Sequence, residues 1–254
     1  MRFGQVGYEI KENIAIITLD DEEKLNALSK NIRYGLSCAL DELEKEDEVK
    51  VAIITGKGRT FCAGGDISGF SFEMKEVKKF LKEVILLFNR IEKLNKPIIA
   101  AVNGLALGGG LELAISCDLI IASQEAKFGT PEINIGLVPA FAMLRLDKIV
   151  GKVKAKEIIL TGNIYTAEEM LKINLINKVT LPEKLMEEAL ETAKKLINNS
   201  LMAMGFAKSA INRAFGGEDL TYTIDGTAHL FATEDAKEGV SAFLQKRKPS
   251  FKDR

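Results

Sequence analysis

The sequence predicts an α/β protein in which buried strands alternate with amphipathic helices. Five apolar runs bounded by turn residues are expected to form strands, at residues 8–10, 14–19, 51–55, 97–102 and 118–123. Residues 28–46 and 74–94 carry apolar side chains every three or four positions, which is typical of helices that cover a core. Strands and helices that alternate in this way favour a layered α/β architecture.

Local signals support the individual elements. Glu12 and Asn13 stand between the first two strands and predict a turn there. Glycines follow the strands at 51–55 and 97–102, where they permit sharp reversals of the chain. Three later helices are expected, at residues 153–160, at 167–171, and from Pro182 to about residue 197.

The character of the chain changes near residue 198. Beyond it, only helical patterns are found, at about 201–215, 219–233 and 236–245. Amphipathic helices outside a core need a partner surface. The sequence therefore predicts a core over residues 1–198 and a helical region for docking or assembly over 199–254.

Composition excludes several classes of protein. The 254 residues are 46% hydrophobic, which is enough for a substantial core, and the formal net charge is -1. A near-neutral charge argues against a nucleic-acid or membrane-surface binder, and no apolar run approaches the length that crosses a bilayer. The N-terminus lacks the apolar stretch of a signal peptide, and three widely spaced cysteines form neither a disulfide framework nor a zinc pattern. We therefore expect a cytoplasmic protein without a bound metal.

Two glycine-rich segments stand out. Residues 61–67 follow the strand at 51–55, and Gly108, Gly109 and Gly110 follow the strand at 97–102 and open a short helix. Each segment can present a free backbone N–H group near a chain reversal, and a helix N-terminus also favours negative charge. Two such donors aimed at one oxygen would form an oxyanion hole, although either segment alone is typical of an ordinary turn.

Two carboxylates accompany the glycines. Glu112 lies among Leu111, Leu113 and Ala114, where burial raises the pKa of a carboxyl group and suits it to acid–base chemistry. Glu132 directly follows Pro131, a position that is more typical of the first turn of a helix. The sequence thus predicts a buried carboxylate near an anion-holding backbone.

Together these residues resemble the crotonase superfamily, also called the enoyl-CoA hydratase/isomerase family. The similarity extends over nearly the whole chain and is carried by residues 21–28, 61–67, 101–118, 128–139, 160–162 and 234–251. It implies a spiral of repeated ββα units, followed by a C-terminal all-helical region that mediates trimerisation. Trimers in this family usually pair into hexamers, so the resemblance implies a homotrimer or a dimer of trimers.

The resemblance also implies a substrate and a chemistry. Members of the family act on acyl-CoA thioesters and hold the thioester carbonyl between two backbone N–H groups, which match Gly65 and Gly109 here. Glu112 and Glu132 match the two glutamates of the hydratases. Glu112 would activate water for attack at the β-carbon, and Glu132 would help to hold that water and supply the α-proton. The expected reaction is the reversible hydration of a trans-2-enoyl-CoA, with no cofactor beyond the coenzyme A of the substrate.

Further positions are implied for binding the coenzyme A part. They are Lys24, Ala27, Ala63, Asp66 and Ile67, with Lys246 from the C-terminal tail adding charge on the phosphate side. One segment departs from the hydratase pattern, because Ala140 stands where a glycine donates its N–H group to the catalytic water, and residues 140–146 contain no glycine. The Cβ atom of Ala140 restricts the backbone angles that are available there.

Other functions stay open at this level. Within the superfamily, double-bond isomerisation or thioester hydrolysis is the nearest alternative, since such enzymes often lack one glutamate. Nucleophilic catalysis by Cys62 has no evident histidine partner, so a small buried thiol is favoured. A protein that binds coenzyme A without turnover is the alternative from another class. Binding of RNA is disfavoured by the near-neutral charge.

Overall fold

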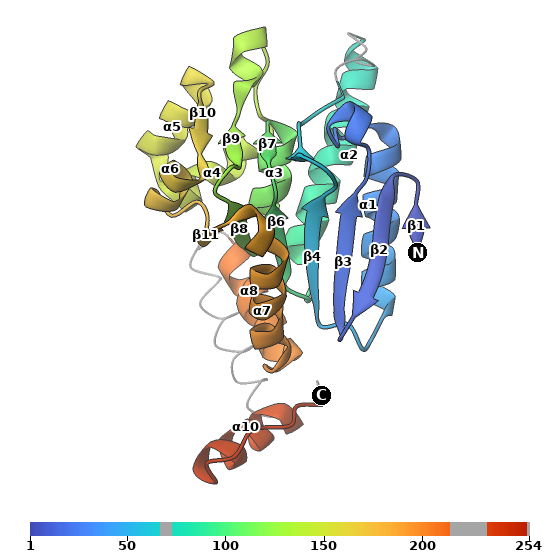
Figure 1. Cartoon of the computed structure of the whole chain (residues 1–254), viewed down its shortest axis with the longest axis vertical. Helices are drawn as coiled ribbons and strands as arrows, with labels where there is room; N and C mark the ends of the chain where they lie inside the picture. The colour runs from blue at the N-terminus through green and yellow to red at the C-terminus, as the bar shows by residue number, and fades with distance from the viewer. Residues whose placement is uncertain (67–72, 214–232, 253–254) are drawn as a thin grey trace.

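The computed structural model describes residues 1–66, 73–213 and 233–252 and contains two β-sheets with helices on their faces (Figure 1). The larger sheet has seven strands in the order β1-β2-β3-β4-β6-β8-β11, and the smaller has four in the order β10-β9-β7-β5. This mixed α/β arrangement confirms the predicted fold class.

The centre of the protein is built from a repeated unit of two strands and a helix. The repeats are β4 (Val51–Gly56), β5 (Thr60–Cys62) and α2 (Met74–Lys93), then β6 (Ile98–Val102), β7 (Leu105–Leu107) and α3 (Gly109–Ser116), then β8 (Leu119–Ser123), β9 (Lys127–Gly129) and the 3-10 helix η3 (Pro131–Ile135). The first strand of each unit joins the large sheet, and the second joins the small one. Neighbouring units pair in parallel in both sheets, which produces the spiral of ββα units.

The remaining elements flank these repeats. On the N-terminal side lie β1 (Arg2–Phe3), β2 (Val6–Lys11), β3 (Ile14–Leu19), η1 (Glu22–Lys24) and α1 (Lys30–Lys45). On the C-terminal side lie α4 (Ala142–Val150), α5 (Lys152–Thr161), β10 (Ile164–Thr166), α6 (Ala167–Lys172), β11 (Lys178–Thr180), η4 (Pro182–Lys184), α7 (Leu185–Ile197), α8 (Leu201–Asn212) and α10 (Glu234–Leu244).

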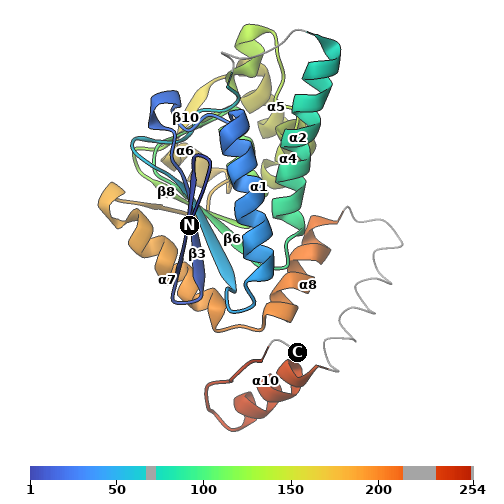
Figure 2. The ribbon, with the colours of Figure 1, turned by 90° about the vertical axis from the view of Figure 1, so that its right-hand side faces the viewer.

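The helices cover the large sheet on both faces. Alternate strand residues on one face pack with α1, α2 and α3 in the main hydrophobic core. On the other face, Ile53, Ile99 and Ile121 pack against Leu185 and Ala189 of α7. Figure 2 shows α1 and α2 on one side of the sheet and α7 on the other. Strands β4, β6 and β8 are therefore buried on both faces, which explains their continuous apolar sequences.

Most predicted elements are present close to their expected bounds. The turn at Glu12 and Asn13 is a two-residue hairpin in which both residues have positive φ, as a type I′ turn requires. Pro182 begins a 3-10 turn and the α-helix starts at Leu185, so the expected single helix is divided in two. The expected helix at 219–233 falls almost entirely outside the described residues.

The helical C-terminal region is present, and its first helix is tied to the core. The Lys208 ammonium of α8 donates to the Asp118 carboxylate at 2.7 Å and to the Ile91 carbonyl at 2.9 Å. Both views show α10 apart from the sheets, beyond the ends of α7 and α8 (Figures 1 and 2). The division at residue 198 remains a prediction about domains.

Candidate active site

The two glycine-rich segments meet at one end of the fold. A Cβ atom added to Gly109 would lie 3.6 Å from the Gly64 Cα and 3.7 Å from the Gly64 carbonyl carbon, to which the Gly65 nitrogen is bonded. Gly109 is the first residue of α3, where helix geometry leaves N–H groups without acceptors. Among the described residues, neither the Gly65 nor the Gly109 N–H has a backbone acceptor. The predicted pair of donors is therefore brought together.

Glycine is required beside this pair. Gly108 has φ +52°, in the region that favours glycine, and an added Cβ would lie 2.6 Å from the Glu132 Oε1. Gly64 has φ +100°, and its added Cβ would lie 2.8 Å from the Leu107 carbonyl oxygen. The missing side chains thus allow the 61–67 segment to approach α3 and allow the Glu132 carboxylate to approach Gly108.

Glu112 is buried in α3 with only 5% of its surface exposed. Its Oε1 accepts hydrogen bonds from the backbone N–H groups of Phe141 at 2.7 Å and Ala142 at 2.8 Å. Burial, assisted by the charge of Glu132 and opposed by the two N–H bonds, raises the pKa of Glu112 from 4.5 to about 7. A carboxyl group that titrates near neutrality can both accept and release a proton.

Glu132 lies in η3, with its carboxylate against Gly108. Its Oε2 is buried and has no hydrogen-bond partner among the residues that the structure describes. Burial raises the pKa of this carboxyl group as well. A buried polar atom without a partner is costly, so its presence beside a second carboxylate indicates a group that serves a ligand.

The structure explains how the chain accommodates alanine at position 140. Ala140 is absent from the residues with positive φ, so its Cβ atom causes no backbone strain in the left-handed region. The N–H groups that reach Glu112 come from the next two residues, Phe141 and Ala142, at the start of α4. The sequence analysis singled out Ala140 and missed these two donors, because residue identities do not show where the backbone N–H groups point.

Several of the predicted coenzyme A residues form a group near Gly64. Lys24 and Asp66 form an ion pair at 2.7 Å. The Ala63 N–H donates to the Leu25 carbonyl at 3.1 Å, and the Ala27 N–H donates to the Lys24 carbonyl at 3.0 Å. The segment with Lys24 and Ala27 therefore lies directly beside the one with Ala63 and Asp66. Ile67 falls outside the described residues.

Lys246 is not brought to this group within a single chain. It follows α10, which lies at the opposite end of the molecule from β7 and β9 (Figure 1). The role of Lys246 in binding the coenzyme A part therefore stays a prediction. Cys62 is fully buried, and burial raises the pKa of its thiol to about 12, so it is not a ready nucleophile.

Asn26 is a structural residue of the site that sequence reasoning did not assign. It is completely buried with φ +55°, and its amide donates to the Lys57 and Thr60 carbonyls at 3.0 and 2.7 Å. Its carbonyl accepts from the Asp21 N–H at 2.8 Å. Asn26 thereby fixes the turn that contacts the 61–67 segment. The sequence signal for this role was an asparagine that stands between two apolar residues at a turn.

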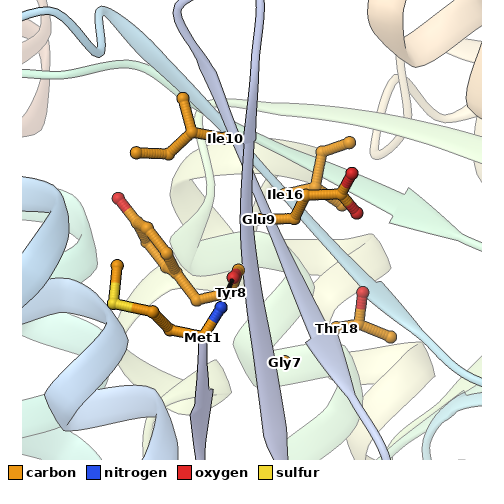
Figure 3. A pocket seen from close by; sticks show the side chains of 7 residues that line it. All are labelled: Met1, Gly7, Tyr8, Glu9, Ile10, Ile16 and Thr18. Atoms are coloured by element: carbon orange, nitrogen blue, oxygen red, sulfur yellow. Dashed lines mark hydrogen bonds between the residues drawn. The ribbon is translucent and has the colours of Figure 1, made fainter.

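A cavity of about 460 Å³ lies elsewhere, on β2 and β3. Figure 3 shows its lining residues, which are Met1, Gly7, Tyr8, Glu9, Ile10, Ile16 and Thr18. None of them is a candidate site residue, and Glu9 is the single carboxylate among them. We therefore locate the candidate active site by its chemistry, around Glu112 and Glu132, rather than by this hollow.

The fold and site together define a protein of the ββα-spiral class with an acid–base centre beside paired backbone donors. The chain belongs to the enoyl-CoA hydratase/isomerase family, because the sequence model of that family matches residues 9–254. It is 40% identical to the short-chain-enoyl-CoA hydratase of Clostridium acetobutylicum, with full coverage of both chains. It is 37% identical to the crotonyl-CoA hydratase of Syntrophomonas wolfei, with 99% of each chain covered.

Solved structures agree with this assignment. The enoyl-CoA hydratase of Bacillus anthracis superimposes with a TM-score of 0.93 at 31% identity, and the match covers 98% of this chain and all of that one. In the part of the chain that the structure describes, no helix is both long and apolar enough to cross a membrane.

Proposed function

We propose that this protein is an enoyl-CoA hydratase, a hydro-lyase that adds water reversibly to a trans-2-enoyl-CoA to give a 3-hydroxyacyl-CoA. The observation that carries the proposal is the pairing of Glu112 with Glu132 beside the Gly65 and Gly109 donors. Full-length similarity to proteins named as hydratases supports the same reaction.

In the proposed reaction, each group has one task. Ionised Glu112 removes a proton from water while the water oxygen bonds to the β-carbon of the substrate. The electron pair of the double bond moves toward the thioester carbonyl, whose oxygen becomes negative. The N–H groups of Gly65 and Gly109 stabilise this oxyanion, a contribution of roughly 3–4 kcal/mol per donor in comparable sites. As the electron pair returns to the α-carbon, Glu132 supplies a proton there, which completes the addition of H and OH; Glu112 then releases its proton and Glu132 takes one up before the next turnover.

The protonation states fit these tasks. Glu112 titrates near neutrality and is partly ionised there, with two N–H groups that favour the charged form. The raised pKa of Glu132 favours a protonated acid, and its unpaired Oε2 is free to contact a ligand. No step requires a metal or an organic cofactor, so we propose that the substrate brings the only coenzyme.

We further propose that the substrate is held through Lys24, Ala27, Ala63 and Asp66, and that the chain assembles as a homotrimer or a dimer of trimers. Large apolar side chains exposed on η3, on the loop that follows it, and on α4 and α5 support assembly, since exposed apolar surface of this kind marks interaction sites. They include Ile135, Leu137, Val138, Met143, Leu144, Val153 and Leu160. Light scattering on the purified protein measures the subunit number.

The test is the loss of the enone absorbance of crotonyl-CoA on adding protein. Wild type should bleach the band, and Glu112→Gln and Glu132→Gln should each lose most of the rate. A variant that keeps full activity without Glu132 would instead indicate a one-carboxylate isomerase. Binding of crotonyl-CoA without bleaching would refute hydration of this substrate.

A further inference from the structure

The position of Glu112 depends on the start of α4. Its Oε1 accepts two backbone hydrogen bonds, from the N-cap residue Phe141 at 2.7 Å and from Ala142, the first residue of the helix, at 2.8 Å. A displacement of α4 would therefore move or release the carboxylate. The N-cap of α4 has no side-chain hydrogen bond that would hold it in place.

The side chain of Phe141 holds this turn against α2. Its ring is fully buried and meets the Phe88 ring edge-on, with the centroids 5.2 Å apart. The Arg145 guanidinium lies over the Phe141 ring at 5.0 Å from its centroid. Because residues four apart lie on one helix face, Arg145 can contact Phe141 and α2 at once.

Arg145 is itself fixed to α2 by three hydrogen bonds. Its Nε and Nη2 donate to the two carboxylate oxygens of Glu92 at 2.7 and 2.9 Å, and Nη2 also donates to the Asn89 carbonyl oxygen at 3.2 Å. This fork geometry is specific to arginine, because a lysine ammonium cannot form the parallel pair of bonds. The chain of contacts thus runs from α2 through Arg145 and Phe141 to Glu112.

We propose that Arg145 and Glu92 are positioning residues that hold the start of α4 so that its N–H groups orient the Glu112 carboxylate. This inference rests on the proposed hydration at the same site. Neither residue touches the substrate in the proposed reaction, so their effect is exerted entirely through Phe141 and Ala142. The alternative is that the ion pair only joins two helices and contributes to stability.

The protein offers a matched control for that alternative. Arg90, also on α2, binds Asp41 at 2.7 Å and Glu44 at 2.6 Å and so joins α2 to α1. Its side chain is 26% exposed, as is that of Arg145. Arg90→Lys therefore removes a comparable helix-to-helix arginine pair that has no contact with Phe141.

The experiment compares Arg145→Lys, Glu92→Gln and Arg90→Lys by thermal unfolding and by hydration of crotonyl-CoA across pH. We expect Arg145→Lys and Glu92→Gln to lower kcat between about 10- and 100-fold with little change in KM, because small misplacements of a reacting group have effects of this size. Arg90→Lys should reduce thermal stability comparably and leave kcat unchanged. Equal losses of stability in Arg145→Lys and Arg90→Lys, with kcat preserved in both, would overturn the proposal.

The pH profile supplies a readout that a structural role would not move. The acid limb of kcat/KM should follow the ionisation of Glu112, whose pKa is about 7 in the wild type. Loosened N–H bonds stabilise the carboxylate less, so the limb should move to higher pH in Arg145→Lys and Glu92→Gln. Glu132 is the titratable group whose ionised form raises the pKa of Glu112, and all three variants retain it.

A titration by NMR of protein labelled with 13C in glutamate separates this inference from the proposed function. The Glu112 signal is assigned by its loss in Glu112→Gln and needs no turnover. If wild type fails to hydrate crotonyl-CoA, the proposed function fails. A higher pKa of Glu112 in Arg145→Lys and Glu92→Gln than in wild type would still support positioning. An unchanged pKa in Arg145→Lys and Glu92→Gln would refute it.

Discussion

Replacing Glu112 with glutamine should stabilise the protein at alkaline pH while removing its activity. Glutamine has nearly the same shape, and its carbonyl can still accept the N–H bonds of Phe141 and Ala142. What the substitution removes is the cost of ionising a carboxyl group that is almost completely buried.

The magnitude follows from the pKa of Glu112. Burial raises it from 4.5 to about 7 in the folded protein, and at about 1.36 kcal/mol per pKa unit this difference corresponds to about 3 kcal/mol. Because the folded-state pKa lies above the unfolded one, the folded state binds the proton more tightly. Wild-type stability should therefore decline as pH rises from about 4.5 through about 7, and the full cost applies above that range.

The assay is thermal unfolding at pH 5 and pH 8.5, at one protein concentration because assembly links stability to concentration. For a chain of this size, about 3 kcal/mol corresponds to a change in Tm of about 6–12 °C. The advantage of Glu112→Gln over wild type should appear at pH 8.5 and shrink strongly at pH 5. Glu125→Gln, which changes an exposed glutamate, is the control. An equal Tm difference at both pH values would refute the reasoning.

Three further substitutions test separate parts of the structure. Gly108→Ala places a Cβ 2.6 Å from the Glu132 Oε1 at φ +52°, so kcat with crotonyl-CoA should fall by more than about tenfold while the circular dichroism spectrum is retained. Lys208→Met leaves the Asp118 carboxylate without its ammonium partner and should lower the free energy of unfolding in urea by about 3–5 kcal/mol. Thr166→Ala removes the capping box of α6 and should lower the Tm by about 2–4 °C, which corresponds to about 1 kcal/mol.

Much of the fold could be predicted because its elements carry strong local signals. The helix at residues 28–46 and the strands at 51–55 and 97–102 appear within two residues of their expected bounds. The short strands β5, β7, β9 and β10 were missed as strands. Each has only three residues, too few for a period-two pattern, and each forms because a neighbouring unit offers it a partner.

The candidate site, like the fold, could be predicted only in part from the sequence. Glu112 was conspicuous because a charged residue inside an apolar helix demands an explanation, and the paired glycines carried the family resemblance. Glu132 was ambiguous, because a glutamate after proline is typical of a helix start. Only the structure shows that its side chain is half-buried against Gly108 and that its Oε2 is buried without a partner among the described residues.

The sequence by itself determined the fold class, the family and the residue types of the site, because these depend on hydrophobic periodicity and on motifs read within one segment. Only the tertiary structure decided which backbone groups hold Glu112, and that Arg145 reaches Phe141 and Glu92 together. Apart from the contact between Arg145 and Phe141, which lie four residues apart, these contacts join positions more than 25 residues apart. Their geometry depends on the packing of whole helices, which no local pattern encodes.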